Sequence, residues 1–204
     1  MKVLLINGSP RKEGNTFLAL SEAAAELQRN GIETEIVSLG THPVRSCIAC
    51  NSCKNKGANR CVFDDDLCNH VADKMKHCDG LIIGSPVYYG QPNGGLLSLM
   101  QRLFYSAGSY LPGKPAAAVA VCRRGGATAT LQTLTMPFMM MHMPVVTSQY
   151  WNIVYGRDAG EAALDQEGMQ TMRSLAKNMA AMLHALANQP RPVYEQRRAM
   201  NFIR

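Results

Sequence analysis

The sequence predicts an α/β fold in which an open, doubly wound parallel sheet of five strands is covered by helices on both faces. Short apolar stretches alternate with amphipathic stretches of helical period along the 204 residues, without an internal repeat or a linker. The stretches 3–6 and 114–122 are almost wholly apolar, as strands are when both faces of a parallel sheet are covered. Because crossovers between parallel strands are right-handed, the helices divide between the two faces. We therefore expect one domain over residues 1–204.

The individual elements follow from residue spacing and from the residues that end each stretch. Apolar residues recur at helical spacing from Phe17 to Leu27, and the Asn30-Gly31 pair ends that helix. Residues 32–39 alternate in character, which predicts a strand with one exposed face. The third strand should break at Gly84, where Ser85 and Pro86 follow. The expected strands lie at 3–6, 32–39, 79–84, 114–122 and from 144 onward, and the expected helices at 16–30, 67–75, 91–106, 128–141 and 169–186.

The composition is that of an ordinary globular protein and excludes several classes of function. Hydrophobic residues make up 47% of the chain and charged residues 18%, and the longest apolar runs are far shorter than a membrane span. The N-terminus enters a strand pattern without the form of a signal peptide, so we expect a cytoplasmic protein. The formal net charge of +6 is spread without a dense basic stripe, which argues against nucleic acid and suits anionic ligands.

The segment 7–16, between the first strand and the first helix, has the composition of an anion-binding loop. A strand, a polar loop with glycine and a helix N-terminus leave backbone N–H groups and the positive end of the helix dipole facing the loop. Further hydroxyl, amide and guanidinium donors come from Ser9, Arg11, Asn15 and Thr16. Neither the Walker spacing nor the dinucleotide glycine pattern is present. The loop favours a terminal monophosphate, such as that of FMN, over an ordinary turn capped by Asn15 or Thr16.

Two further loops should lie beside this one. In an open parallel sheet, ligands bind outside the carboxyl ends of the strands, which brings together segments 7–16, 85–91 and 123–128. Each segment contains glycine, so the backbone can approach a flat ligand closely. The second segment supplies apolar and aromatic side chains suited to a ring system, namely Pro86, Val87, Tyr88 and Tyr89. We expect the three loops to bind the phosphate and the ring of one mononucleotide.

The motifs GSPRKEGNT after the first strand and GSPVYYG after the third resemble those of the NADPH-dependent FMN reductase and iron–sulfur flavoprotein family. The resemblance covers nearly the whole chain and implies a flavodoxin-like fold with strand order 2-1-3-4-5. It also implies that the FMN phosphate is held by Ser9, Arg11, Asn15 and Thr16. By the same resemblance, the isoalloxazine ring is contacted by Pro86, Val87, Tyr88, Tyr89 and Gly90, and the loop with Arg123, Arg124 and Gly125 closes the third side.

Seven cysteines in such a chain are not expected to form structural disulfides. Cys68, Cys78 and Cys122 fall on expected helices or strands and are interpreted as core residues. The other four lie in a cysteine-rich loop over 45–61 and are Cys47, Cys50, Cys53 and Cys61. Their close spacing lets four thiolates surround one metal centre. The spacing resembles the motif with which iron–sulfur flavoproteins bind a [4Fe–4S] cluster. Zinc, metal-free thiols and a redox-active pair remain alternatives.

The function expected from these features is that of an FMN-dependent oxidoreductase. Electrons would pass from NAD(P)H through bound FMN to a small acceptor, such as a quinone, a flavin, an azo compound or a metal ion. The flavin N5 would carry the chemistry, so no catalytic side chain is expected. One alternative is an electron-transfer flavoprotein with FMN and a cluster on the four cysteines, whose acceptor could be another protein. The other alternative is a cofactor-free binding protein of the same fold.

The resemblance also implies a homodimer or homotetramer. Family members commonly assemble with the flavin at a subunit interface. In this chain the methionine-rich stretch 136–143 is a candidate oligomer surface, with plain helix core as the alternative.

Overall fold

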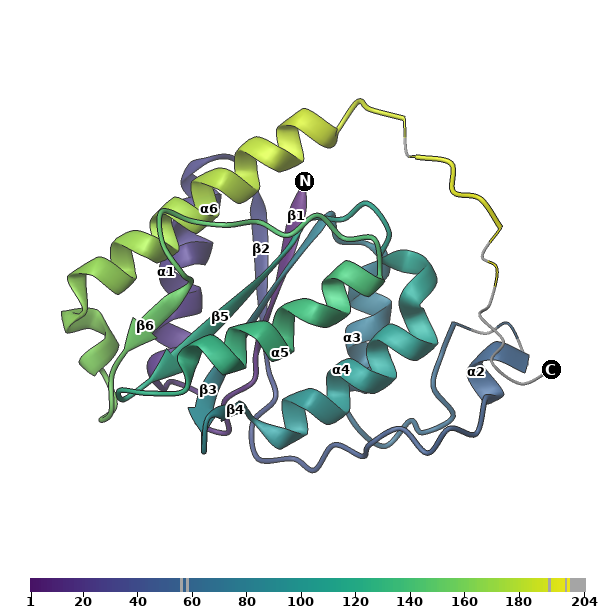
Figure 1. Ribbon diagram of the computed structural model, residues 1–204, viewed down its shortest axis with the longest axis horizontal. Helices are drawn as coiled ribbons and strands as arrows, with labels where there is room; N and C mark the ends of the chain where they lie inside the picture. The colour runs from purple at the N-terminus through teal and green to yellow at the C-terminus, as the bar shows by residue number, and fades with distance from the viewer. Residues whose placement is uncertain (56, 58, 191, 197, 199–204) are drawn as a thin grey trace.

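The computed structural model, which describes residues 1–55, 57, 59–190, 192–196 and 198, has a parallel sheet at its centre with helices on both sides (Figure 1). The parallel strands are β1 (Lys2–Asn7), β2 (Glu33–Ser38), β3 (Gly80–Tyr88), β5 (Ala116–Cys122) and β6 (Ile153–Tyr155). They are arranged in the order β2-β1-β3-β5-β6, which confirms the predicted order of the five parallel strands. A sixth strand, β4 (Gln91–Pro92), was not predicted and pairs antiparallel with the end of β3.

The helices divide between the two faces of the sheet as predicted. On one face, α1 (Asn15–Arg29) packs against α6 (Gln166–Leu186) over one hydrophobic cluster. The opposite face is covered by α3 (Leu67–Lys76), α4 (Gly94–Ala107) and α5 (Ala127–Met140) over a second cluster. Short additional turns are α2 (Ser52–Asn55), η1 (Gly108–Tyr110) and η2 (Glu161–Leu164). In the part of the chain that the structure describes, no helix has the length and apolarity needed to cross a membrane.

The third strand does not break at Gly84 as predicted but continues to Tyr88. Beyond Gly84, the last residue of β3 that pairs with β1, the strand pairs with β5 as far as Pro86 and then with β4. Backbone N–H groups alternate between the two neighbouring strands, and that of Leu81 points to β5. The missing N–H of Pro86 therefore faces the side where β1 has already ended, so this proline costs no ladder hydrogen bond.

The fifth parallel strand begins later than predicted. Val145 makes only an isolated bridge to Ala116, and the chain then leaves the sheet before returning at Ile153, which pairs with Ala120. Between the two pairings the edge segment advances eight positions, from 145 to 153, whereas β5 advances four, from 116 to 120. The extra residues bulge outward between the two pairings.

The connection from β2 to α3 is long and contains the cysteine-rich loop. Only α2 interrupts its irregular backbone among the described residues, and positions 56 and 58 of the loop lie outside the description. The loop runs over α3 and α4 at the end of the molecule next to α2 (Figure 1). Its structure therefore depends on side-chain contacts with these two helices.

Candidate functional site

The N-terminus of α1 is open toward the loop that precedes it. Its N-cap is Gly14, which provides no side-chain cap. Among the described residues, none accepts a hydrogen bond from the backbone N–H groups of residues 15–17. Ser9 and Thr16 lie beside this helix end and are 4% and 2% exposed. Uncapped N–H groups at a helix N-terminus attract an anion.

The loop is held in place by its own polar groups and by one glycine. Asn7 Oδ1 accepts a hydrogen bond from the Ser9 N–H at 3.1 Å, and Ser9 Oγ accepts one from the Arg11 N–H at 3.1 Å. A Cβ at Gly8 would lie 2.5 Å from Leu96 Cδ2 and 2.9 Å from the Gly84 carbonyl oxygen. The loop therefore packs directly on the backbone of β3, and only glycine fits at this position.

Asn15 has a different role from the one predicted for its side chain. Its Nδ2 donates to the Asp158 carbonyl at 2.9 Å, and its Oδ1 accepts from the Ala162 N–H at 3.2 Å. A Cβ at Gly156 would lie 2.8 Å from Asn15 Nδ2. The amide thus fastens the segment after β6 to the start of α1, and only the backbone N–H of Asn15 faces the anion position.

The three predicted loops and a fourth one meet in a single pocket at the carboxyl ends of the strands. Of the twelve residues predicted to bind the cofactor, eight line it: Ser9, Arg11, Asn15, Thr16, Pro86, Val87, Tyr88 and Arg123. Cys122, Gly156 and Arg157 also line it, and sequence reasoning missed them as site residues. A signal for Gly156 and Arg157 was available, because they form a glycine-containing basic loop after the last parallel strand.

Tyr89, Gly90, Arg124 and Gly125 do not line this pocket but lie at its edge. Tyr89 has a positive φ of 50° and a fully exposed side chain. The next residue, Gly90, touches Gly126, where an added Cβ would lie only 2.6 Å from the Gly90 Cα. Both glycines have positive φ, so the loops after β3 and β5 meet backbone to backbone.

The pocket is electropositive and its donors suit a phosphate monoester joined to a flat ring. Arg11, Arg123 and Arg157 line it, and among the described residues no aspartate or glutamate does. Burial raises the pKa of the Cys122 thiol, which keeps this group neutral. The uncapped N–H groups, the buried hydroxyls of Ser9 and Thr16 and the arginines supply the donors that a phosphate needs. The apolar end of β3, with Pro86 and Val87, lines the same pocket.

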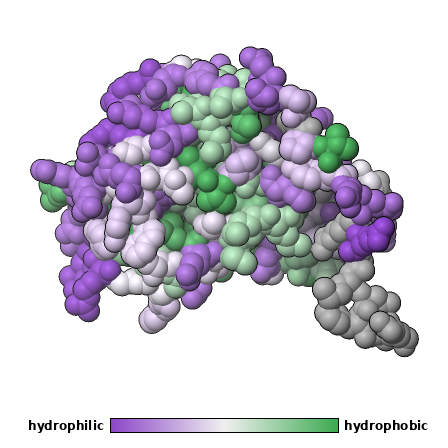
Figure 2. Space-filling model, turned by 45° about the horizontal axis from the view of Figure 1, so that its top comes forward, coloured by the Kyte–Doolittle hydropathy of each residue, from purple (hydrophilic) through white to green (hydrophobic). Residues whose placement is uncertain are grey.

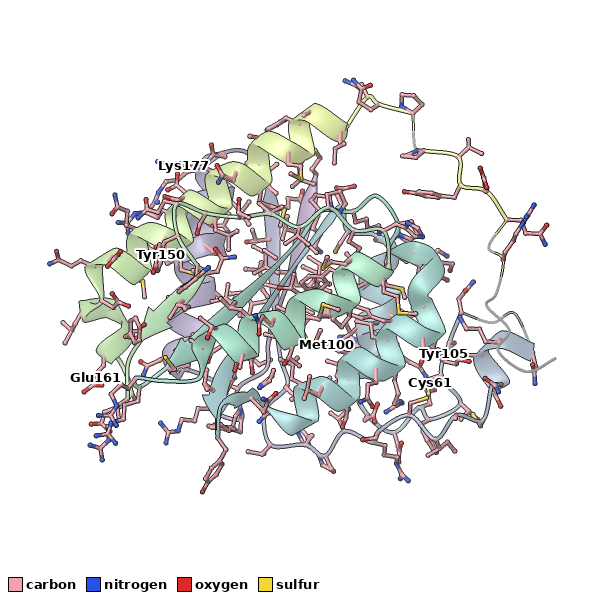
Figure 3. The ribbon with its side chains drawn as sticks, in the orientation of Figure 1. Cys61, Met100, Tyr105, Tyr150, Glu161 and Lys177 are labelled. Carbon is pink, nitrogen blue, oxygen red and sulfur yellow. The ribbon has the colours of Figure 1, made fainter. Side chains whose placement is uncertain are left out.

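The four cysteines predicted as metal ligands line a second, small pocket together. Cys47, Cys50, Cys53 and Cys61 surround it with apolar and aromatic neighbours, among them Phe63 and Tyr105. Figure 3 shows Cys61 beside Tyr105 at one end of the long axis, whereas Glu161, next to the first pocket's Arg157, lies at the other. The two candidate sites are therefore on different sides of the molecule.

The second pocket presents hydrogen-bond donors to its sulfur atoms. Arg102 Nε donates to Cys61 Sγ at 3.2 Å, and the Ala49 N–H donates to Cys47 Sγ at 3.5 Å. Hydrogen bonding from Ser52 lowers the pKa of Cys50. Ala49 and Asn51 both have positive φ, of 54° and 56°. For Ala49 this conformation costs about 1–2 kcal/mol, and such strain concentrates at functional sites.

The four thiols lie farther from one another than the ligands of a single metal ion do. In the described residues, no three histidine, cysteine, aspartate or glutamate side chains are close enough to hold one metal ion. Tetrahedral zinc needs bonds of about 2.3 Å from each thiolate, so its ligands have to crowd together. Four thiols in one pocket, with N–H groups aimed at sulfur, are a donor set that fits a sulfur-bridged iron centre.

The remaining cysteines have the structural role that was predicted. Cys68, Cys78 and Cys122 are at most 4% exposed. Burial raises the pKa of Cys68 to about 12 and also raises that of Cys78, so both stay protonated at neutral pH. They contribute to packing, with Cys122 also forming a wall of the first pocket.

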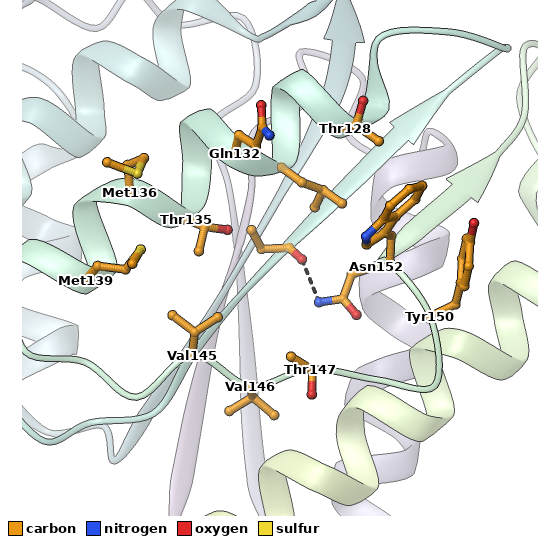
Figure 4. Close-up of a pocket in the computed structure, with 13 residues that line it drawn as sticks. Thr128, Gln132, Thr135, Met136, Met139, Val145, Val146, Thr147, Tyr150 and Asn152 are labelled. Atoms are coloured by element: carbon orange, nitrogen blue, oxygen red, sulfur yellow. Dashed lines mark hydrogen bonds between the residues drawn. The ribbon is translucent and has the colours of Figure 1, made fainter.

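A third cavity of about 350 Å³ lies between α5 and the bulged segment before β6 (Figure 4). Its lining contains no charged residue and includes Met136, Met139, Tyr150 and Trp151, all more than half exposed. Figure 2 shows hydrophobic side chains reaching the surface across the middle of the face that it presents. The cavity lacks the cationic donors of the first pocket and does not suit a phosphate. The prediction of an oligomer surface at 136–143 stays a prediction.

Comparisons with known proteins agree with this arrangement. The family model described as NADPH-dependent FMN reductase matches residues 1–158. An iron–sulfur flavoprotein of Methanocaldococcus jannaschii is 39% identical over 191 residues, which is 90% of this chain and 97% of that protein. An iron–sulfur flavoprotein of Methanosarcina thermophila is 32% identical over 193 residues, covering 91% of this chain and 97% of that protein.

Solved structures share the fold at low sequence identity. RosB, crystallised with 8-demethyl-8-formylriboflavin 5'-phosphate, superimposes with a TM-score of 0.74 at 17% identity over 93% of this chain and 81% of its own. The apo form of the NADH:FMN oxidoreductase EmoB gives a TM-score of 0.64 at 17% identity, over 93% of this chain and 91% of its own. An archaeal flavodoxin gives 0.58 at 14% identity, over 90% of this chain and 99% of its own. These likenesses confirm the flavodoxin-like fold.

Proposed function

The chain belongs to the NADPH-dependent FMN reductase family, and on this premise we propose that it passes electrons from NAD(P)H through FMN bound in the first pocket to a small acceptor. The observation that carries the proposal is the uncapped start of α1, faced by buried hydroxyls and three arginines at the carboxyl ends of the strands. This donor set suits a phosphate, and the segment 86–88 across the pocket suits a ring.

Each part of the chain has a defined task in this proposal. When bound, FMN supplies the ability to accept a hydride and release electrons to an acceptor. The N–H groups of residues 15–17 and the hydroxyls of Ser9 and Thr16 bind the phosphate, with Arg11 adding charge. The segment 86–90 and the loop from Arg123 to Gly125 orient the ring, because Gly90 and Gly126 fix these two loops against each other.

The side chains around the proposed ring position set the charge of the pocket and take no part in proton transfer. Cys122 stays a neutral thiol because burial raises its pKa. The guanidinium groups of Arg123 and Arg157 line the pocket and favour an anionic ligand. Arg124 follows Arg123 directly in the chain but does not line the pocket. The proposed hydride transfer needs no acid–base pair, and the absence of a catalytic side chain stays a prediction.

Binding of FMN and of riboflavin to the metal-free, flavin-free protein tests this proposal. The two ligands differ only in the phosphate, so the proposed site predicts FMN binding at least a hundredfold tighter, measured by quenching of flavin fluorescence. Addition of NADH or NADPH without oxygen should then bleach the bound flavin. Equal affinity for the two ligands would remove the phosphate site. Tight FMN binding without bleaching by either nucleotide would leave a flavoprotein that takes its electrons from elsewhere.

A second candidate function is that of an electron-transfer flavoprotein with a [4Fe–4S] cluster. It is favoured by the shared pocket of Cys47, Cys50, Cys53 and Cys61 with N–H donors aimed at sulfur. Two relatives above 30% identity carry the name iron–sulfur flavoprotein. A bound cluster would supply single-electron transfer, and the four thiolates would hold its irons.

Iron and acid-labile sulfide, assayed on protein purified without oxygen, test the second candidate. About four irons and four sulfides per chain, lost together when Cys53 is replaced by serine, would support it. Cys78→Ser is the matched control, because Cys78 is buried away from the loop. Flavin without iron would leave only the reductase, and a colourless protein that binds no flavin would favour the cofactor-free alternative.

A further inference from the structure

Arg102 is a buried arginine that belongs neither to the first pocket nor to the sheet. It lies on α4 and is 1% exposed. Its guanidinium donates four hydrogen bonds: Nε to Cys61 Sγ at 3.2 Å, Nη1 to Asp66 Oδ2, Nη1 to the Arg45 carbonyl at 3.2 Å and Nη2 to the Phe63 carbonyl at 3.1 Å. All four acceptors lie in the segment 45–66. The residue thus joins both ends of the cysteine-rich loop to one rigid helix.

The charge of Arg102 is balanced by a single carboxylate. The Asp66 side chain is 3% exposed and also accepts hydrogen bonds from the N–H groups of Arg45 and Cys68. The ring of Phe63 lies under the guanidinium, 5.3 Å from its centre, and covers it from solvent. A planar guanidinium that is buried and makes four hydrogen bonds cannot be replaced by another side chain without loss of contacts.

Among the four thiols of the second pocket, Cys61 depends most on contacts from outside the loop for its position. The other three lie within 47–53, whereas Cys61 belongs to a separate stretch next to α3. Asn69 fixes its backbone, since it accepts from the Cys61 N–H at 2.9 Å and donates to the Cys61 carbonyl at 3.0 Å. Arg102 then fixes its sulfur atom at the wall of the pocket shared with the other three cysteines.

We propose that Arg102 is a positioning residue for the sulfur centre of this pocket, which holds Cys61 Sγ in place and sets the reduction potential of the centre through its charge and its N–H···S bond. The inference rests on the second proposed function. Reduction adds one electron, and therefore one negative charge, to a centre held by thiolates. A fixed positive charge and a donor at one of the sulfurs stabilise the more negative state, which raises the reduction potential.

The potential of the centre in Arg102→Gln tests the electrostatic half of the proposal. We expect the ratio of reduced to oxidised centre at a fixed solution potential to fall at least tenfold, equivalent to 59 mV for one electron, in an anaerobic titration followed by electron paramagnetic resonance. Arg60→Gln is the matched control, because Arg60 belongs to the same loop but bonds only the carboxylates of Asp64 and Asp73. An equal shift in both variants, or none in Arg102→Gln, would overturn this half.

Hydrogen exchange of the metal-free protein tests the positioning half independently of any cluster. Arg102→Lys keeps a positive charge opposite Asp66, so the fold is retained, but it loses the planar fork that reaches Cys61 and Phe63. We expect faster amide exchange at Cys61 and Phe63 than in wild type or in Arg60→Lys, with α4 unchanged. Unchanged exchange at both amides would refute the positioning role. Absence of iron from every preparation would refute the cluster and the electrostatic half, while the exchange result would still decide the positioning.

Discussion

The phosphate loop at 7–16 and the cysteine-rich loop at 45–61 are both irregular segments at the edge of the same sheet, but they are built in different ways. The first connects the end of β1 to the start of α1 through residues 8–14 and is shaped by Asn7, Ser9 and the close packing of Gly8 on β3. The second runs over α3 and α4 and takes its shape from Arg102, Asp66 and Asn69. The backbone thus builds one site, and a few buried side chains build the other.

This difference predicts how each site responds to change. Donors on the backbone cannot be removed by side-chain substitution, so the phosphate site should lose affinity in moderate steps. The cysteine pocket depends on one buried ion pair, and breaking such a pair leaves an uncompensated charge away from water. Substitutions at the two loops therefore separate ligand affinity from stability.

The largest effect is expected for Asp66→Ala. The change leaves the Arg102 guanidinium buried without its partner and removes the N-cap of α3, so unfolding in urea should become easier by about 3–5 kcal/mol. Asp65→Ala is the control, because the Arg45–Asp65 pair is exposed and should contribute less than about 1 kcal/mol. Equal losses in the two variants would mean that the buried pair is not what holds the loop.

A smaller loss is expected for Gly126→Ala on the flavin side. Gly126 has a φ of 88°, and the new Cβ would lie 2.6 Å from the Gly90 Cα, so we expect a loss of about 1–3 kcal/mol in thermal unfolding. FMN affinity should fall as well, because the loops after β3 and β5 must separate. Gly125→Ala meets open space and provides the control. The same loss at both glycines would rule out the backbone contact as its cause.

Arg11→Ala should change affinity without changing stability. A hydrogen bond to a charged phosphate contributes about 1.5–3 kcal/mol, so FMN should bind roughly tenfold to a hundredfold more weakly. The affinity for riboflavin should stay as it is, because riboflavin has no phosphate. Lys12→Ala is the control, since Lys12 is exposed and does not line the pocket. A parallel loss of riboflavin affinity would place Arg11 against the ring instead.

The smallest effect is expected from acid, through Asp66 at the cysteine-rich loop. Burial raises the pKa of Asp66, but hydrogen bonds from Arg102 and from backbone N–H groups outweigh it, so the pKa is lowered overall. Asp66 therefore contributes stability above its unfolded pKa of about 3.9, and this is lost as pH falls through the folded value. In limited proteolysis at pH values from 5 down to 2.5, cleavage in the cysteine-rich loop should begin at a higher pH than cleavage in the phosphate loop. If the loop of Asp66→Ala showed the same pH dependence of cleavage as the wild type, groups other than Asp66 would cause it.

Most of the fold could be predicted because its signals are local. Helical spacing and apolar runs gave the helices to within a few residues, and the parallel order followed from the family resemblance. The end of β3 was predicted too early because Pro86 was taken as a strand breaker. The cost of a proline depends on which neighbouring strand its nitrogen faces. The late start of the fifth strand was missed for a similar reason, since the bulge before Ile153 shows only in its pairing with β5.

Local sequence was enough to predict the alternating sheet and helix architecture, the polar loop at 7–16 and the grouping of the four thiols, because each depends on residues close together in the chain. Only the tertiary structure decided that the Asn15 amide is bound to the segment after β6, 143 residues away, and that Arg102 reaches Cys61 and Asp66 across 41 and 36 residues. Such contacts form when α3 and α4 pack on the sheet and bring the ends of distant loops together. No local pattern of charge or spacing records which side chains will meet there.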